Sequence, residues 1–199
     1  SFYPTKILTT GEGGMITTNN KSLYKKFLIL REHGKNNPSE NIHTELGYNW
    51  RMGELEGLLG VNQMKIANKI LKTRRDQAYL YNSLLQGLPN LRLQKIPKNI
   101  RSSYYKYIVF VNKDIRKRVK DIMKNKFGIY LPGEVYRFPC HSQPVFKKYK
   151  NLIIKKGKQN FFNAKKISDE QLCLPLYPGL TEKEIRHVAN SLKKVLNYF

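Results

Sequence analysis

Lys6 is the residue of this chain whose type and setting best suit covalent chemistry. It follows a proline–threonine pair that favours a turn, and it precedes a β-prone run, residues 6–9, that leads into the glycine-rich segment 11–14 (GEGG). A lysine held between a constrained turn and a buried strand loses solvation, which favours the neutral amine over the ammonium. The neutral amine is the nucleophile that forms a Schiff base with an aldehyde. The alternative for Lys6 is a strand-end lysine at the surface.

Other combinations of reactive residues are excluded by their spacing. Cys140 and His141 are sequence neighbours, and neighbours in an extended segment point to opposite sides, so they cannot form a nucleophile–base pair. Segment 11–14 lacks the GxxxxGK(S/T) spacing of a phosphate-binding loop, so close backbone packing is the expected role of its glycines. The chain's two cysteines, Cys140 and Cys173, fit neither a disulfide framework nor a metal site, which predicts no metal and a reducing, cytoplasmic compartment.

The elements expected to position Lys6 lie in the first third of the chain. Residues 6–9 and 15–18 are β-prone runs on either side of the glycine turn and predict a hairpin. Residues 19–20 (NN) then precede a helix that is expected to end near Arg31, with Gly34 as its C-terminal cap.

A second helical pattern without proline runs from residue 52 to about residue 86. Its length predicts either a helix broken near Asn62 or Asn68 or a bridge between two lobes. Residues 87–90 (GLPN) end it, so the sequence predicts one domain over residues 1–88 and a small α+β domain over residues 89–199.

The small domain is expected to alternate strands and helices. Asp114 is predicted to cap a helix that Gly128 closes, and a capping box at residues 181–184 (TEKE) predicts the start of the last helix. Strands are expected over residues 104–111, 128–135 and 171–174, and a short helix over residues 161–167.

Length and composition limit the class of protein. The chain has 199 residues and a formal net charge of +23. Hydrophobic residues make up 40% of it, and enough of them are aromatic to build a core, which excludes intrinsic disorder. No apolar run reaches the roughly 20 residues of a membrane helix. The charge comes from 27 Lys and 10 Arg and is densest over residues 113–126 and 147–158. Without a zinc-finger or RNA-binding motif, it favours a solvated lysine-rich surface over a nucleic-acid-binding one.

The motifs around Lys6 resemble a known family. Residues 1–6 (SFYPTK) and 9–15 (TTGEGGM) resemble the lysine segment of the DegT/StrS-type sugar aminotransferases, which are pyridoxal 5′-phosphate (PLP) enzymes of fold type I. The resemblance spans the chain in order and continues through residues 31–34 (REHG) and 47–52 (GYNWRM), Gly60, Gln63, and residues 136–141 (YRFPCH) and 174–181 (LPLYPGLT).

The resemblance implies an α/β fold in which an incomplete PLP-transferase large domain, made of the hairpin and helices, precedes the small α+β domain. Lys6 matches the lysine that binds PLP as a Schiff base and then moves a proton between the sugar carbon and the cofactor. Ser1 stands where the family places a hydroxyl that donates to the cofactor phosphate. Asn49 matches an asparagine that reaches the cofactor phosphate of the neighbouring subunit, so the active site would be shared across a homodimer.

Four further residues are candidates for substrate binding. Arg51 could hold an anionic donor or the nucleotide. His33 ends a helix, where capping or packing fits it as well as contact with substrate. Tyr136 and His141 lie in a loop that the family brings toward the sugar, and a rim loop without a direct role is the alternative.

The implied reaction moves an amino group from an amino acid, glutamate by family resemblance, to PLP and then to a keto group of a nucleotide-linked sugar, in amino-sugar and polysaccharide biosynthesis. A PLP-dependent sugar dehydratase of the same fold is one alternative. Because some dehydratases replace the lysine with histidine, Lys6 favours transfer. A basic nucleic-acid-binding module or an inert remnant of a decayed gene is the other alternative.

The family's members are about twice as long as this chain. The part that precedes the lysine in the family supplies the acidic partner of the pyridinium nitrogen, a residue that stacks on the ring and a helix N-terminus for the phosphate. This chain begins without an initiating Met and almost at the lysine. We therefore expect a segment of a longer enzyme that does not hold PLP productively alone and that exposes an apolar surface where the preceding sheet packs.

Overall fold

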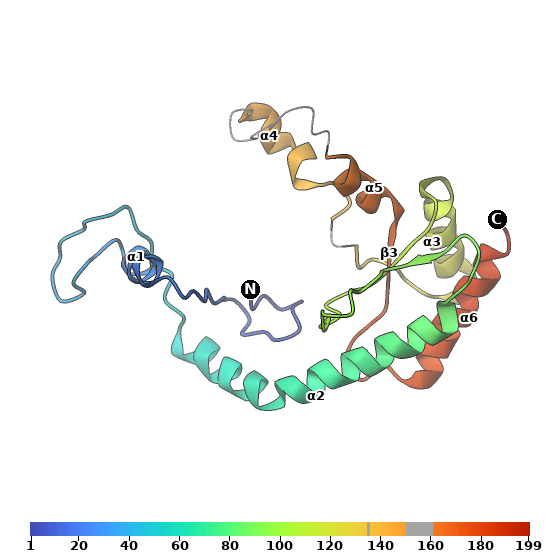
Figure 1. Cartoon of the computed structure of the whole chain (residues 1–199), viewed down its shortest axis with the longest axis horizontal. Helices are drawn as coiled ribbons and strands as arrows, with labels where there is room; N and C mark the ends of the chain where they lie inside the picture. The colour runs from blue at the N-terminus through green and yellow to red at the C-terminus, as the bar shows by residue number, and fades with distance from the viewer. Residues whose placement is uncertain (135, 150–160) are drawn as a thin grey trace. The chain divides into compact units, whose positions relative to one another are not determined.

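The computed structural model describes residues 1–134, 136–149 and 161–199 (Figure 1). The chain divides into two compact units, Ser1–Ile70 and Leu71–Phe199, which are described separately below. The elements in chain order are α1 (Lys21–Arg31), α2 (Glu54–Leu85), β1 (Arg92–Leu93), β2 (Tyr107–Phe110), α3 (Lys113–Phe127), the 3-10 turn η1 (Cys140–Ser142), α4 (Pro144–Lys148), α5 (Phe162–Glu170), β3 (Gln171–Leu174) and α6 (Glu182–Leu196).

Helix α1 forms as the sequence predicts. The Asn20 side chain accepts hydrogen bonds from the amides of Ser22 and Leu23, which satisfies donors that the first turn of a helix leaves unpaired. After the helix, Gly34 has a φ of +76° and its amide donates to the carbonyl of Ile29 at 2.9 Å. Gly34 therefore closes the helix end in the conformation that glycine adopts most easily.

The predicted hairpin over residues 6–9 and 15–18 is wrong. The first twenty residues contain no strand, and the backbone of Phe2 takes the place of a partner strand. Its carbonyl accepts from the amide of Thr10 at 3.0 Å and its amide donates to the carbonyl of Gly13 at 2.9 Å. The segment closes on itself through these two bonds, so the β-prone residues 6–9 have no ladder to join.

Helix α2 is 32 residues long and unbroken, so the predicted break at Asn62 or Asn68 is wrong. The Asn62 amide nitrogen instead donates to the carbonyl of Leu58 one turn earlier, at 3.0 Å. The alternative interpretation, a helix that belongs to two lobes, agrees with the division of the chain inside α2. The domain boundary after Leu88 stays a prediction. Within the described residues, no helix is long and apolar enough to cross a membrane.

The second unit is built on a three-stranded antiparallel sheet in the order β1-β2-β3 (Figure 1). Tyr107 pairs with Leu174 and Val109 with Leu172, so these four side chains share one face of the sheet. This face belongs to the main core, together with buried residues of α2, α3 and α6. Strands β2 and β3 confirm the prediction, whereas the two residues of β1 are too few for a periodic signal.

Residues 128–134 form no strand, so the strand predicted over residues 128–135 is wrong for that part of the chain. Val135 lies outside the described residues. Residues 128–134 pair with no strand: Ile129 and Leu131 are buried in the main core, and Gly133 lies close to Cys173 of β3. An ideal Cβ on Gly133 would lie 3.1 Å from the Cβ of Cys173. The amide nitrogen of the Gln171 side chain donates to the carbonyl of Tyr136 at 2.9 Å.

The helices of the second unit begin and end near the predicted caps, but the residue that caps the start of α3 differs from the predicted one. Helix α3 is capped by Asn112, whose side chain accepts from the amide of Asp114 at 3.0 Å, so Asp114 lies in the first turn instead of capping it. Gly128 ends the helix with a φ of +67°. Helix α5 extends the predicted 161–167 helix to Glu170, and the basic stretch 147–158 lies mostly outside the described residues.

The second half of α2 satisfies buried backbone carbonyls of two loops. Arg74 donates to the carbonyls of Tyr104 and Tyr105, at 3.0 and 2.8 Å. Gln77 donates to the carbonyls of Tyr177 and Leu180, at 3.0 and 2.9 Å.

Two tyrosines add neutral donors to this network. The Tyr81 hydroxyl donates to the carbonyl of Pro175 at 3.0 Å, and the Tyr107 hydroxyl donates to the side-chain oxygen of Asn82 at 2.7 Å. Burial raises the pKa of Tyr81 and of Tyr107 above the ordinary tyrosine value, so both remain protonated donors over the physiological range.

The predicted capping box begins α6. The Thr181 hydroxyl and amide both donate to the Glu184 carboxylate, at 2.7 and 2.8 Å, and these bonds lower the pKa of Glu184. The amide of Glu184 in turn donates to the Thr181 hydroxyl at 3.3 Å. Because the folded pKa lies below that of the unfolded chain, the carboxylate's contribution to stability is present above the ordinary glutamate pKa of about 4.3 and is lost as the pH falls through the lowered value.

We therefore predict that Thr181→Ala lowers the free energy of unfolding by about 1 kcal/mol near neutral pH, since it removes an N-cap. Denaturant unfolding of the two proteins measures the difference. The difference should shrink as the pH falls through the lowered pKa of Glu184, since protonation removes the carboxylate that accepts the two Thr181 bonds. Thr181→Ser keeps the hydroxyl and should restore stability, and equal stability of the wild type and Thr181→Ala at neutral pH would contradict the role of the box.

Candidate active site

Lys6 lies at the end of a tight turn in the first unit. The Lys6 amide donates to the carbonyl of Tyr3 at 2.9 Å, and Pro4 stands at the second position of this four-residue turn, where its fixed φ is favourable. The Lys6 side chain is half-buried. The turn therefore fixes the backbone from which the amine projects, while solvent still reaches part of the side chain.

Two threonines after Lys6 close the loop that carries it. The Thr9 hydroxyl donates to the carbonyl of Phe2 at 2.9 Å, beside the bond from the amide of Thr10. Thr10 is buried, and its hydroxyl donates to the carbonyl of Glu12.

The glycines beside Thr10 permit close packing, as the sequence predicts. Gly13 has a φ of +132°, and an ideal Cβ there would lie 2.8 Å from the Thr10 hydroxyl oxygen. On α2, an ideal Cβ at Gly60 would lie 3.1 Å from the Thr10 methyl carbon. A side chain at either glycine would displace Thr10 and with it the loop that ends in the Lys6 turn.

Ser1 retains a hydroxyl hydrogen for a ligand. Its oxygen accepts from the amide of Tyr3 at 3.4 Å, a long bond that leaves the hydroxyl free to donate. The residue is exposed, and its Cα lies 3.8 Å from the ideal Cβ position of Gly14. The Ser1 hydroxyl and the Lys6 amine are thus carried by one loop that is closed by the backbone of Phe2.

The loop over residues 32–51 carries the other three candidates of the first unit. The Tyr48 amide donates to the carbonyl of Leu30 at 2.8 Å, and the Trp50 amide donates to the carbonyl of Arg31 at 3.1 Å. Between them Asn49 is exposed, and its side chain makes no hydrogen bond to any described residue, which leaves its amide group available to a ligand.

Arg51 and His33 have structural contacts in this loop. Arg51 forms an ion pair with Glu32, with 48% of the arginine side chain exposed. His33 has a φ of +56°, and its amide donates to the carbonyl of Tyr48 at 2.9 Å. These contacts support the helix-end role of His33, and a contact of either residue with substrate stays a prediction.

Two features of this loop escape the sequence analysis. An ideal Cβ on Gly47 would lie 2.0 Å from the Gly34 amide nitrogen, so two glycines allow the two ends of the loop to touch. The rings of Tyr48 and Trp50 are stacked, with centroids 4.2 Å apart and planes within 6° of each other. The spacing of these two aromatics at i and i+2 is the signal that could have predicted the stack, because such residues share one side of an extended segment.

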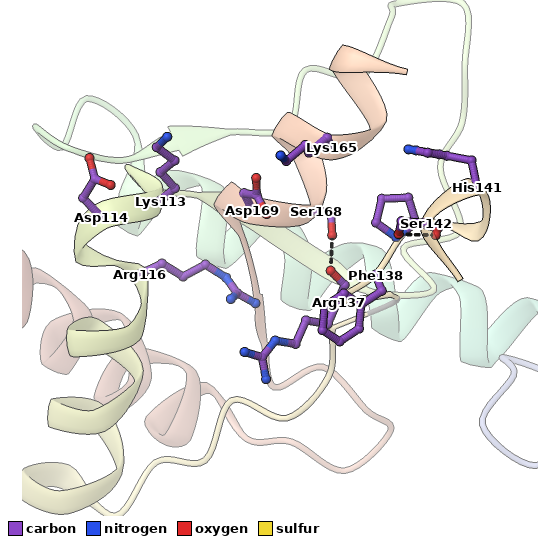
Figure 2. Close-up of a pocket in the computed structure, with 11 residues that line it drawn as sticks. Lys113, Asp114, Arg116, Arg137, Phe138, His141, Ser142, Lys165, Ser168 and Asp169 are labelled. Carbon is purple, nitrogen blue, oxygen red and sulfur yellow. Dashed lines mark hydrogen bonds between the residues drawn. The ribbon is translucent and has the colours of Figure 1, made fainter. Parts of the chain in front are cut away.

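Tyr136 and His141 belong to the second unit. The Tyr136 side chain is 65% exposed, while its carbonyl accepts from the side chains of Gln171 and Ser168, at 2.9 and 3.2 Å. Ser168 also donates to the carbonyl of Arg137 (Figure 2). His141 stacks on the ring of Phe161 with centroids 4.3 Å apart.

The structure therefore places Ser1 and Lys6 in one loop and His33, Asn49 and Arg51 in a second loop of the same unit, with Tyr136 and His141 in the other unit. The sequence analysis missed two buried polar residues, Ser168 in the last turn of α5 and Gln171 at the start of β3, and no local signal marks either of them.

The donors of the first unit fit the two reactive ends of PLP. Lys6 offers a primary amine for the aldehyde, and Ser1 and Asn49 offer a hydroxyl and an amide with free donors for the phosphate. Among the described residues, no group of three or more His, Cys, Asp or Glu side chains is arranged to hold a metal ion.

A lysine at the end of a proline turn, followed by a glycine loop that packs on a long helix, agrees with the lysine segment expected of a PLP-dependent aminotransferase of fold type I. The chain belongs to the DegT/DnrJ/EryC1/StrS aminotransferase family, which it matches over residues 1–193. Proteins of this family use PLP, and solved structures similar to this chain include the PLP form of a sugar aminotransferase homologue from Streptococcus pneumoniae. The expected family, fold class and cofactor are confirmed.

Individual relatives show how much of the family's length the chain covers. An uncharacterized protein of Methanocaldococcus jannaschii is 30% identical over 99% of this chain and 53% of its own length. GDP-perosamine synthase of Vibrio cholerae is 29% identical over 100% of this chain and 52% of its own length. The solved structure of PseC, an aminotransferase of pseudoaminic acid biosynthesis from Helicobacter pylori, has the same fold, with a TM-score of 0.82 at 24% identity over 100% of this chain and 53% of PseC. The chain thus spans about half the length of these relatives.

We predict that Gly47→Ala opens the loop that carries Asn49, because its Cβ has no room beside Gly34. Trp50 is the chain's single tryptophan, so its fluorescence reports the loop, and loss of the Tyr48 stack should shift the emission. Gly57→Ala is the matched control, since an ideal Cβ there has open space and alanine is the better helix former by about 1 kcal/mol. An unchanged Trp50 spectrum in Gly47→Ala would contradict the close approach.

We also predict that Gln171→Leu lowers the free energy of unfolding by about 1–3 kcal/mol, since it removes a buried donor from the Tyr136 carbonyl. Hydrogen exchange of residues 137–149 should accelerate. The control is Gln143→Leu, which removes a bond to the Phe138 carbonyl at the surface and should change stability by less than about 0.5 kcal/mol. Equal effects of the two substitutions would show that the buried bond does not hold this loop.

Proposed function

We propose that this chain supplies the catalytic lysine of a PLP-dependent aminotransferase that acts on nucleotide-linked sugars. The observation that carries the proposal is Lys6 at the end of its proline turn, in a chain that matches an aminotransferase family over residues 1–193. The names of the relatives support the substrate class: GDP-perosamine synthase in Vibrio cholerae and a UDP-4-amino-4,6-dideoxy-N-acetyl-beta-L-altrosamine transaminase in Campylobacter jejuni, the latter 26% identical.

In this proposal the chain's own residues bind, orient and move protons. When bound, PLP carries an amino group from an amino acid, glutamate by family resemblance, to the keto carbon of the sugar. The Lys6 amine would hold the cofactor covalently, and it would move a proton at the carbon that gains or loses the amino group, since a neutral amine is a suitable general base. The Ser1 hydroxyl donates to the cofactor phosphate.

The remaining candidates complete the site in a homodimer. Asn49 donates to the cofactor phosphate of the partner subunit, which its free and exposed amide permits. Arg51 holds the anionic part of a substrate, and exchange of its ion pair with Glu32 for a substrate phosphate or carboxylate costs little because the pair is exposed. Tyr136 and His141 approach the sugar. We propose a cytoplasmic location, which fits an enzyme that uses nucleotide sugars and whose cysteines, Cys140 and Cys173, are not joined in a disulfide.

The first unit also supports the proposal that the 199 residues alone are inactive. Its buried residues are Thr10, Gly34 and Ala67, so it has no apolar core of its own. Large apolar side chains are instead exposed, among them Leu46 at 85%, Leu55 at 75% and Met64 at 64%. We propose that this surface packs on the part of the large domain that the longer relatives have and this chain does not cover.

The test of the aminotransferase proposal is Lys6→Ala in the complete protein. Transfer of an amino group from glutamate to a nucleotide-linked keto sugar should fall by a factor of about 10³ or more, because the group that binds the cofactor and moves the proton is lost. Lys26→Ala, which removes an exposed lysine of α1, should leave the rate unchanged. Glutamate-dependent transfer at the wild-type rate by Lys6→Ala would overturn the proposal, and dehydration of the sugar without amino transfer by the wild type would favour the dehydratase.

A further inference from the structure

A cavity of about 600 Å³ in the second unit is lined by cationic side chains from three separate segments (Figure 2). Lys113 and Arg116 come from the first turn of α3, Arg137 from the loop before η1, and Lys165 from α5. The volume lies within the range of small-molecule binding sites, about 300–1,000 Å³.

Buried contacts hold the backbone around this cavity. Ser168 is 5% exposed and donates to the carbonyls of Tyr136 and Arg137, which ties the loop to α5 one turn from Lys165. Arg116 donates from Nε to the carbonyl of Gln171 at 2.7 Å, with 14% of its side chain exposed. The cations therefore project from segments with fixed positions, which a specific site needs.

The charges around the cavity are unevenly compensated. Arg116 is paired with Glu134, but Lys113, Arg137 and Lys165 have no carboxylate within 4 Å among the described residues. The carboxylates of Asp114 and Asp169 also line the cavity without forming an ion pair with these cations. In Figure 2 the guanidinium ends of Arg116 and Arg137 extend into the same part of the cavity.

Because Arg116 is paired with Glu134, the cationic groups of the cavity that have no paired carboxylate among the described residues are Lys113, Arg137 and Lys165. Guanidinium groups bind the oxygens of phosphate in a bidentate manner, and ammonium groups add point charges. The walls also contain Phe138, whose ring is 58% exposed, and the His141 ring that stacks on Phe161. A flat aromatic wall beside a cationic group suits an organic phosphate better than a bare ion.

We propose that this cavity binds a small molecule that carries a phosphate or diphosphate group, through Arg116 and Arg137 with Lys113 and Lys165. The proposal rests on residues of the second unit and involves neither Lys6 nor its cofactor, although it shares His141, which the proposed function brings to the sugar. It predicts a specific anion site on a protein whose high positive charge also attracts anions without specificity.

Calorimetric titration of the purified protein at fixed salt tests the site, first with inorganic diphosphate and then with uridine diphosphate. We expect saturable binding at one site per chain. The double variant Arg137→Gln/Lys165→Gln should weaken it by about tenfold or more, as expected when two charge-assisted contacts are lost. Both residues are exposed, so the fold should persist, which thermal unfolding checks. Tighter binding of uridine diphosphate than of diphosphate would assign the aromatic wall to the nucleoside, and equal affinities would assign the site to the phosphates alone.

The matched control is Lys183→Gln/Lys194→Gln, which removes the same charge from exposed positions of α6 that do not line the cavity. It should change the affinity by less than about twofold, since exposed charges act weakly at a distance. Lys6→Ala should bind diphosphate as the wild type does, whether or not it transfers amino groups. Absence of saturable binding, or equal losses in the two double variants, would overturn the proposed site.

Discussion

The second unit depends on one constraint, which is that the backbone carbonyls of its loops must find donors where water cannot reach them. A buried carbonyl without a partner costs about 1–3 kcal/mol, and α2 meets this requirement from three positions at successive turns. Arg74, Gln77 and Tyr81 donate to carbonyls of the loops before β2 and after β3. These loops in turn set where the sheet begins and where α6 starts, so the polar residues of one helix fix the frame on which the apolar core packs.

The first unit is held by other means. Its contacts are backbone hydrogen bonds at Phe2 and Tyr48 and close approaches at Gly13, Gly34 and Gly47, with a single buried apolar side chain, Ala67. Such contacts give the Lys6 turn a precise shape but supply little hydrophobic stabilisation. Under the proposed function, a lysine that binds a cofactor and also moves a proton needs this precision, and the exposed apolar surface of the unit is covered by the rest of the large domain.

The sequence predicts features that are set within one turn of chain and fails where the partner is distant. Asn20, Gly128 and the Thr181 box are correct because a cap needs only its own first or last turn. Residues 6–9 and 128–134 have the composition of strands, yet neither segment has a partner strand. The loop that contains residues 6–9 closes on the backbone of Phe2, and Ile129 and Leu131 pack into the main core. For the site, the motifs identify the family and the loops that carry Lys6 and Asn49, while the roles of these residues stay predictions. Ser168 and Gln171 could not be recognised because their acceptors lie more than thirty residues away.

The most direct test of the central claim asks which of the 27 lysines binds the cofactor. The complete protein would be incubated with PLP, reduced with borohydride, digested, and its peptides analysed by mass spectrometry. The account predicts one modified lysine, Lys6, in the peptide that contains residues 1–6, and loss of that modification in Lys6→Arg. A stoichiometric adduct on another lysine, with Lys6 unmodified, would contradict it.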